Sequence, residues 1–241
     1  MSNRAFALKR QAKHLLRRRD VHITRWSSTV RARRVSILSA LSIAQLIDVG
    51  ANEGQYAEDI RDAGYSGRII SCEPVEQPFR ILERAATGDG LWVCRQVALG
   101  ASHGEAEIAV AGLTVFSSLL SPTAEMLALD PRSAGATVER VPVVTLDELA
   151  SELCDEQPLG VKIDAQGAER QILMGGAKTL ARSAYIELEL SPRPLYEGEA
   201  TMSEMIDRLS DLGYVLGLVE NIASDVRVGR ALQVNGIFVR A

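Results

Sequence analysis

The sequence predicts an α/β fold built on a mostly parallel β-sheet. From residue 43 onward, short apolar runs alternate with segments of helical character, a pattern typical of repeated β-α-β units with right-handed crossovers. The apolar runs contain few polar residues, as expected for strands that helices cover on both faces. With 241 residues, 46% of them hydrophobic, the chain can bury one sizeable core.

The order of the elements follows from these runs and from the residues that end them. Gly64 closes a helical segment as a natural C-terminal cap, and residues 117–137 look irregular or partly helical. Strands are expected at residues 43–50, 67–74, 91–100, 104–112, 139–149, 159–165, 183–190, 214–220 and 231–240. Helices are expected at residues 54–64, 77–86, 168–180 and 201–213.

Charge is distributed unevenly along the chain. Residues 1–40 contain eleven Lys or Arg and one acid, Asp20, so that 16 of the 27 basic and 30 of the 31 acidic residues follow them. We therefore expect a basic helical arm or cap at residues 1–41 and the main domain at residues 42–241. The arm is either docked against its own acidic domain or free to contact an anionic partner, such as a membrane surface or RNA.

Composition excludes several classes of protein. The sequence has no uninterrupted run of about 18 apolar residues, so no membrane-spanning helix is predicted. No apolar segment follows the basic start early in the chain, so a secretory signal is not expected. The three cysteines are widely spaced, and we expect them to be small buried side chains of a protein in a reducing compartment. This favours a cytoplasmic location. Zinc spacing, a P-loop and a G-x-S-x-G motif are absent from the sequence.

The turn after the first strand reads G-x-N-x-G over residues 50–54. A dinucleotide site needs a middle glycine so that the backbone can approach a diphosphate, and Asn52 would crowd that group while still allowing a tight turn. Glu73 ends the next strand, 25 residues after Asp48, and could accept two hydrogen bonds from a ribose, although Glu73-Pro74 could also simply start a helix. A ribose without phosphate, joined to an amino-acid end, indicates S-adenosylmethionine (SAM).

Eight segments carry a resemblance to a known family and run in order over residues 45–240, about four-fifths of the chain. They are LIDVGANEGQYAEDI, IISCEP, QVALG, SSLL, VPVVTLDEL, VKIDAQGAERQILMGGAKTL, IELELSPRPLYEGE and NGIFVR. The first is common to many methyltransferases, whereas its combination with the fifth and sixth is much more specific. On these segments the chain resembles the FkbM family of SAM-dependent methyltransferases.

The resemblance implies a Rossmann-like class I methyltransferase fold, with a mostly parallel seven-stranded sheet and helices on both faces. It also implies methyl transfer to a hydroxyl oxygen, with sugars and natural-product alcohols as typical acceptors. We therefore expect an O-methyltransferase that acts on a sugar, a glycosylated natural product or a glycolipid. Two alternatives stay open: an RNA-modifying methyltransferase anchored by the basic arm, and a non-catalytic SAM-binding scaffold. Nucleic acid is not the expected partner, and a homo-oligomer is compatible with the sequence.

By position, the resemblance also implies which residues would bind the cofactor. Gly50, Asn52 and Gly54 would line the methionine part of SAM, and Asp48 would orient this turn or reach the ammonium group. Glu73 would bind the ribose hydroxyls. The residues expected to flank the adenine are Pro74, Val75, Val97 and Ala98, with core packing as the alternative for the last two.

The segment 161–169 raises the question of catalysis. On a strand, Lys162 and Asp164 share one face, and a lysine buried there requires a carboxylate partner. A sugar hydroxyl needs a base or a metal to become a nucleophile. The candidate catalytic residues are Asp164, Glu187 and Glu189, with Lys162 tuning their pKa values. An ion-pair network that anchors the sheet is the structural alternative.

Two further expectations concern metal and acceptor. The family commonly has an acid where this chain has Gln166, so a divalent metal such as Mg²⁺ or Mn²⁺ is possible but not expected to be strictly required. Topology places residues 113–137 near the acceptor pocket. The residues expected to contact the acceptor are Ser117, Ser118 and Tyr196.

Overall fold

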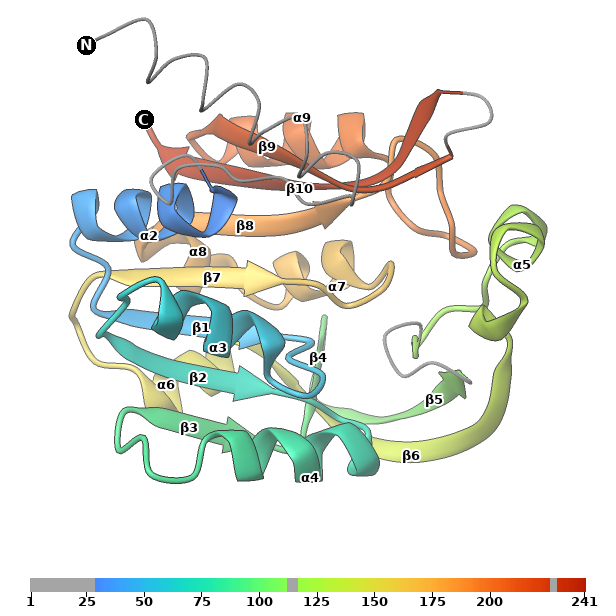
Figure 1. The fold of residues 1–241 in the computed structure, drawn as a ribbon, viewed down its shortest axis with the longest axis horizontal. Coiled ribbons are helices and arrows are strands. Elements are labelled where there is room, and N and C mark those ends of the chain that lie inside the picture. Colours follow the sequence, from blue (N-terminus) through green and yellow to red (C-terminus); the bar gives the residue numbers. More distant parts are fainter. Residues whose placement is uncertain (1–28, 112–116, 226–228) are drawn as a thin grey trace, which may run out of the picture.

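A computed structural model describes residues 29–111, 117–225 and 229–241. Within these residues, seven strands form one sheet in the order β3-β2-β1-β7-β8-β10-β9 (Figure 1). All neighbouring strands are parallel except those paired with β10, which runs antiparallel to β8 and β9. Strand bounds are β1 Gln45–Val49, β2 Arg68–Cys72, β3 Trp92–Arg95, β7 Leu159–Ile163, β8 Ser183–Leu190, β9 Tyr214–Asp225 and β10 Arg230–Arg240. The expected α/β fold is confirmed.

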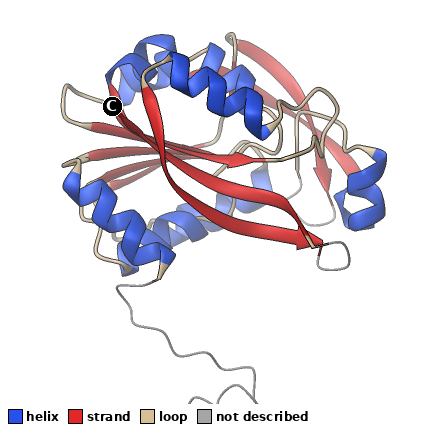
Figure 2. Ribbon diagram, turned by 90° about the horizontal axis from the view of Figure 1, so that it is seen from above, coloured by secondary structure: helices blue, strands red, loops and turns tan. Residues whose placement is uncertain are grey.

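Helices cover both faces of this sheet, as the nearly apolar strands predict (Figure 2). One core contains the apolar side chains of α6 Leu146–Leu153, α7 Glu169–Met174, α8 Ala177–Arg182 and α9 Met202–Asp211. The core on the opposite face contains those of α2 Val30–Ala40, α3 Gln55–Asp62 and α4 Glu76–Ala85. Successive residues of a strand therefore point alternately into the two cores. Polar residues on the face covered by α2 and α3 can line a site there.

A smaller three-stranded sheet lies beside the main one, in the order β4-β6-β5. Its strands are β4 Ala98–Gly100, β5 Gly104–Ala111 and β6 Gly135–Thr145, and α5 Ala124–Leu129 lies between β5 and β6 together with a 3-10 turn, Pro131–Ser133. The prediction of one strand over residues 91–100 is wrong, because the chain turns after β3, where the Val97 N–H bonds the Arg95 carbonyl at 3.1 Å, and continues into the second sheet.

Two other element boundaries differ from the expectation. The strand expected at residues 139–149 ends at Thr145, where Thr145 and Glu148 form a capping box that starts α6. The helix expected at 168–180 is divided between α7 and α8 by Gly175 and Gly176. A Cβ atom on Gly175 would lie 2.2 Å from the Gly100 carbonyl oxygen, so the close approach of α7 to β4 requires this glycine.

The described part of the expected arm is helix α2, which packs as a cap on the main domain. Thr29 caps its first turn through a 3.2 Å bond from the Ala32 N–H. Val35 and Leu38 are buried in the same core as residues of β1 and α3. Residues 1–28, which carry most of the arm's positive charge, lie outside the described residues, so the role of the arm stays a prediction. No helix among the described residues is long and apolar enough to span a membrane.

Candidate active site

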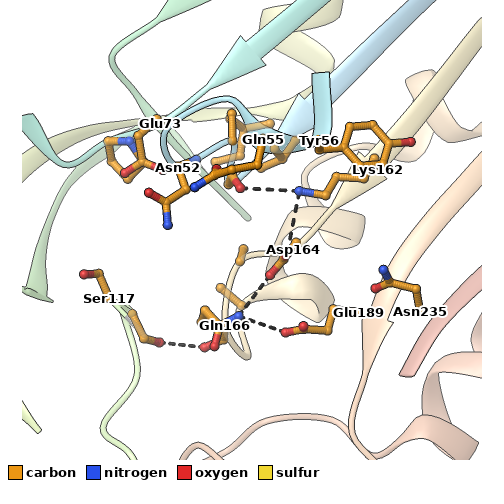
Figure 3. A pocket seen from close by; sticks show the side chains of 18 of the residues that line it. Asn52, Gln55, Tyr56, Glu73, Ser117, Lys162, Asp164, Gln166, Glu189 and Asn235 are labelled. Atoms are coloured by element: carbon orange, nitrogen blue, oxygen red, sulfur yellow. Dashed lines mark hydrogen bonds and ion pairs between the residues drawn. The ribbon is translucent and has the colours of Figure 1, made fainter. Parts of the chain in front are cut away.

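A cavity of about 700 Å³ opens at the carboxyl ends of β1, β2, β7 and β8 (Figure 3). In parallel α/β sheets this edge is where ligands bind, and the volume is typical of small-molecule sites. The predicted site residues that line it are Gly50, Asn52, Glu73, Pro74, Val75, Val97, Ala98, Ser117, Ser118, Lys162, Asp164 and Glu189. The four that do not are Asp48, Gly54, Glu187 and Tyr196, and each of these supports a residue of the lining or its turn, as described below.

The turn after β1 has the backbone geometry that its sequence predicts. Gly50, Asn52 and Gly54 have φ values of 72°, 48° and 97°, all in the left-handed region. A Cβ atom on Gly50 would lie 1.7 Å from the Asp164 carbonyl oxygen, so no other residue can stand there while the loop after β7 approaches so closely. Gly54 starts α3 and packs against Trp92 rather than lining the cavity.

Glu73 lies at the end of β2 and faces this turn. Its Oε2 accepts from the Asn52 N–H and its Oε1 from the Val75 N–H, both at 2.9 Å. Each oxygen keeps one lone pair, which is the arrangement needed to bind two neighbouring hydroxyls. Burial raises the pKa of Glu73 to about 7, although the two backbone bonds favour the ionised form.

An apolar wall stands beside Glu73. It combines the segment after β2 with the connection before β4 and with residues of the small sheet. Its members are Pro74, Val75, Val97, Ala98 and Ile108. The last four are buried where they pack, so Val97 and Ala98 serve the core and the cavity at once. A flat aromatic base can pack on such a surface.

A buried polar row crosses the sheet below the cavity. Trp92 donates to Ser71 at 3.0 Å, and Ser71 donates to Asp48 at 3.2 Å. Asp48 Oδ1 lies 3.0 Å from Lys162 Nζ, which also lies 3.7 Å from Asp164 Oδ2. Burial alone would lower the pKa of Lys162, but the Asp48 and Asp164 carboxylates raise it above its ordinary value. Lys162 is therefore a fixed cation, and Asp48 is its main partner.

Glu187 lies one strand further along the same face, in register with Lys162. It accepts from Arg34 of α2, from Tyr56 of α3 at 2.8 Å and from Tyr185 at 2.6 Å. Burial holds the pKa of both tyrosines well above the ordinary value, so both remain donors. Glu187 thus joins two helices to the sheet, outside the cavity lining, and the geometry does not support its expected catalytic role.

Asp164 and Glu189 are brought together by the amide of Gln166 (Figure 3). Gln166 Nε2 donates to Asp164 Oδ1 at 3.0 Å and to Glu189 Oε2 at 2.8 Å. Its Oε1 accepts from the Tyr196 hydroxyl at 2.8 Å, which fixes the orientation of the amide. Burial, and then the neighbouring Asp164 carboxylate, raise the pKa of Glu189 well above its ordinary value. Such a pair can take up a proton at a higher pH than a lone carboxylate can.

A comparison with protein families covers most of the residues that form this site. The family model for the methyltransferase FkbM domain matches residues 48–216, from the end of β1 into β9. The chain belongs to the FkbM family of methyltransferases. The expected family, and with it SAM as the methyl donor, is confirmed. The 2-O-methyltransferase NoeI of Sinorhizobium fredii (strain NBRC 101917 / NGR234) is 32% identical over 81 residues, which are 34% of this chain and 33% of that relative.

Two solved methyltransferases are similar to this chain at low sequence identity. Magnesium protoporphyrin IX methyltransferase from Synechocystis PCC 6803 with bound SAH is 10% identical, with a TM-score of 0.49 over 88% of this chain and 82% of that one. Precorrin-6y C5,15-methyltransferase from Geobacter metallireducens GS-15 is 12% identical, with a TM-score of 0.47 over 88% of each chain.

The part of this methyltransferase expected to contact the acceptor is held close to Gln166. Ser118 donates to the Gln166 carbonyl at 2.6 Å, and its oxygen accepts from the Leu120 N–H. Tyr196 is buried and pairs with the Pro122 backbone, so it positions Gln166 instead of facing the cavity. Of the segment 113–137, residues 113–116 lie outside the described residues.

Sequence analysis missed the contribution of two elements to the cavity. Arg31 and Arg34 of α2 line it, although α2 was assigned to the arm. Gln233 and Asn235 of β10 line it as well, and Gln233 donates to Glu189 at 2.7 Å. Because β10 runs antiparallel to β8, the first half of β10 lies beside the carboxyl end of β8, where the cavity opens. A polar residue every second position in the sequence QVN was the available signal.

The carboxylates of the cavity do not fit a divalent metal in this arrangement. Among the described residues, no group of three or more His, Cys, Asp or Glu is placed to hold one. The Gln166 N–H groups point at both Asp164 and Glu189, and amide hydrogens repel a cation. Glu169, the next acid along the chain, is turned away and accepts from the Ala165 N–H at 2.8 Å, which holds the loop after β7.

Proposed function

We propose that this methyltransferase transfers the methyl group of SAM to a hydroxyl oxygen of a sugar, a glycosylated natural product or a glycolipid. The observation that carries the proposal is the Asp164–Glu189 pair, joined by Gln166 and facing the same cavity as Glu73. A hydroxyl must lose its proton when it is methylated, and this pair offers a proton acceptor of raised pKa.

The order of the groups that line the cavity supports SAM as its ligand. Glu73 would accept two hydrogen bonds from the ribose, the wall at Val97 and Ala98 would take the adenine, and the turn at residues 50–54 would hold the methionine part. β1 and β7 lie between β2, which Glu73 directly follows, and β8, which carries Glu189. SAM laid across these strands would direct its methyl group toward the carboxyl pair.

In the proposed reaction, the acceptor oxygen attacks the methyl carbon in line with the carbon–sulfur bond. The new oxygen–carbon bond forms as the carbon–sulfur bond breaks, and the sulfonium becomes the neutral thioether of S-adenosylhomocysteine (SAH). The hydroxyl proton passes to the Asp164–Glu189 pair. Because charge is neutralised in this step, holding the two reactants in line contributes more than charge stabilisation does. Lys162, fixed by Asp48, holds Asp164 at the edge of the cavity.

The sugar class of the acceptor is supported by the chemistry of the cavity wall. Besides the carboxyl pair, the wall carries the amides of Gln233 and Asn235 and the apolar side chain of Ile222. Planar polar groups next to an apolar surface suit a ring that carries hydroxyls on its rim and C–H groups on its faces. The relative NoeI is itself a 2-O-methyltransferase.

The test is methyl transfer from labelled SAM to a panel of methyl glycosides, with RNA transcripts as the competing acceptor class. We expect SAH to form with at least one glycoside, the product to carry one added methyl ether, and RNA to remain unmodified. Methylation of RNA alone would replace the proposal with the RNA-modifying alternative. SAH binding with no turnover on any acceptor of the panel would favour a scaffold.

A further inference from the structure

Asn235 on β10 stands between two acidic side chains of neighbouring strands. It is in register with Glu189 of β8 on one side and with Glu220 of β9 on the other. Residues directly opposite one another in antiparallel strands point to the same face of the sheet. All three line the cavity, so Glu189, Asn235 and Glu220 form a second polar row, which runs from the carboxyl pair toward the edge of the sheet. Figure 3 shows the first two of them, Glu189 and Asn235.

The three members of this row differ in whether they already have partners. Glu189 accepts from Gln166 and Gln233, and Glu220 accepts from Arg34 at 3.0 Å. The side-chain amide of Asn235 makes no hydrogen bond to any other described residue, although it is only partly exposed. Its N–H and C=O groups are therefore available to a molecule in the cavity.

The described cations in the wall around Asn235 are paired with acids. Arg34 pairs with Glu187 and Glu220, and Arg31 pairs with Asp59 at 2.8 Å. No cation of this wall is left over for a phosphate or carboxylate among the described residues. Ile222, with 46% of its surface exposed, adds an apolar contact from β9. The surroundings thus suit a neutral ring with several hydroxyls and not an anion.

We infer that the acceptor ring lies between α2 and the β9–β10 hairpin, and that Asn235 binds the hydroxyl next to the one that is methylated. This inference rests on the proposed function. With that neighbour held by Asn235, the reacting hydroxyl lies over Glu189, one strand away, and points toward the methyl group of SAM. Asn235 is then a specificity-determining residue, because an acceptor without the neighbouring hydroxyl leaves its amide unpaired.

The test compares Asn235→Ala with Asn221→Ala, using the methyl glycoside that the wild-type protein methylates best. Asn221 is on the same hairpin, but its exposed side chain pairs with Ser224 outside the cavity. We expect Asn235→Ala to raise KM for the glycoside about tenfold, as for the loss of one or two neutral hydrogen bonds. The Kd for SAH should not change in either variant, and Asn221→Ala should match the wild type. Asn235→Leu, which keeps the side-chain size, replaces it if the alanine variant is unstable.

A deoxy-glycoside series sharpens this comparison. Removing the neighbouring hydroxyl should raise KM about tenfold with the wild type and have no further effect with Asn235→Ala, since both changes remove the same bond. If the deoxy penalty persists in full in the variant, or if the variant behaves like Asn221→Ala, the inference fails while the proposed function stands. If the wild type binds SAH but methylates no glycoside, the proposed function fails, and the ligand assigned to this site fails with it.

Discussion

Arg34 and Glu187 form a buried, bidentate ion pair between residues 153 positions apart in the chain. Arg34 Nε lies 2.9 Å from Glu187 Oε2, and Nη2 lies 2.6 Å from Oε1. Their side chains are 7% and 1% exposed. The pair ties α2 to strand β8, which lies inside the sheet, on the face where Lys162 holds the active-site turn. Helix α2 is thus a structural part of the catalytic domain as well as a wall of its cavity.

Arg34→Met should destabilise the fold by about 3–5 kcal/mol, because it leaves the buried Glu187 carboxylate without its cation. Arg33→Met is the matched control, since Arg33 is an exposed residue of the same helix. Thermal unfolding followed by circular dichroism measures both variants. Equal melting temperatures for the two would show that the pair contributes no stability and that α2 is only an appendage.

Affinity for SAH should rise with pH through the pKa of Glu73. The pKa in the free protein is raised to about 7, so Glu73 is protonated below that pH and cannot accept both ribose bonds. Proton linkage then predicts a Kd about tenfold weaker at pH 6 than at pH 8. Calorimetry should show this dependence in the wild type and in Glu76→Gln, an exposed neighbouring acid. Glu73→Gln should bind weakly and almost independently of pH, and a steep dependence that survives in it would assign the titration elsewhere.

The sequence predicts those features of the site that are determined by residues close together in the chain. The period of two along a strand placed Lys162 and Asp164 on one face, and the register of β1 and β7 then sets Asp48 opposite Lys162. The turn at residues 50–54 was readable for the same reason, since its positive φ angles are set by glycine and asparagine themselves. Such patterns determine the cofactor half of the site.

The acceptor half depends on contacts that no local pattern determines. Arg34 pairs with Glu187 only because α2 packs on β8. Asn235 lies opposite Glu189 only because β10 is inserted antiparallel beside β8. Tyr196 looked like an acceptor contact in the sequence, yet its hydroxyl faces Gln166 from within a buried loop. The side of the sheet on which a loop residue lies follows from the whole fold, and sequence spacing carries no information about it.

Glu189→Gln should remove the acidic limb of the pH–rate profile and lower kcat by about 10²–10⁴-fold. The pKa of Glu189 is raised by burial and by Asp164, so the wild-type limb should lie above about pH 4.3, the ordinary value for a glutamate. As pH falls through that raised value, the pair becomes protonated and loses its capacity to accept the hydroxyl proton. Glu197→Gln, an exposed acid outside the cavity, should keep the profile unchanged. A wild-type limb that survives in Glu189→Gln would assign the base to another group.

Gln166→Glu should replace the bridging amide with a third carboxylate next to Asp164 and Glu189. Turnover should fall without metal, because a donor to both acids becomes a like charge, and the variant should bind Mn²⁺ in electron paramagnetic resonance titrations. Gln157→Glu is the control, since Gln157 also donates to an acid, Asp155 at 3.2 Å, but outside the cavity. Wild-type activity should persist in EDTA. Loss of wild-type activity in chelator, restored by Mg²⁺ or Mn²⁺, would contradict this account of Gln166.

Asp164→Asn should keep the fold and the SAH affinity while lowering turnover by about 10²–10⁴-fold, the range for a positioned acid–base group. The reason is the difference between two distances: Lys162 Nζ lies 3.0 Å from Asp48 and 3.7 Å from Asp164, so the lysine keeps its main partner when Asp164 is neutralised. Asp48→Asn is the matched opposite, because it leaves the buried Lys162 poorly paired and should lower the melting temperature. Calorimetric unfolding, SAH titration and initial rates separate the two. If both variants lose stability alike, Asp164 is structural, and if Asp164→Asn turns over normally, Glu189 alone accepts the proton.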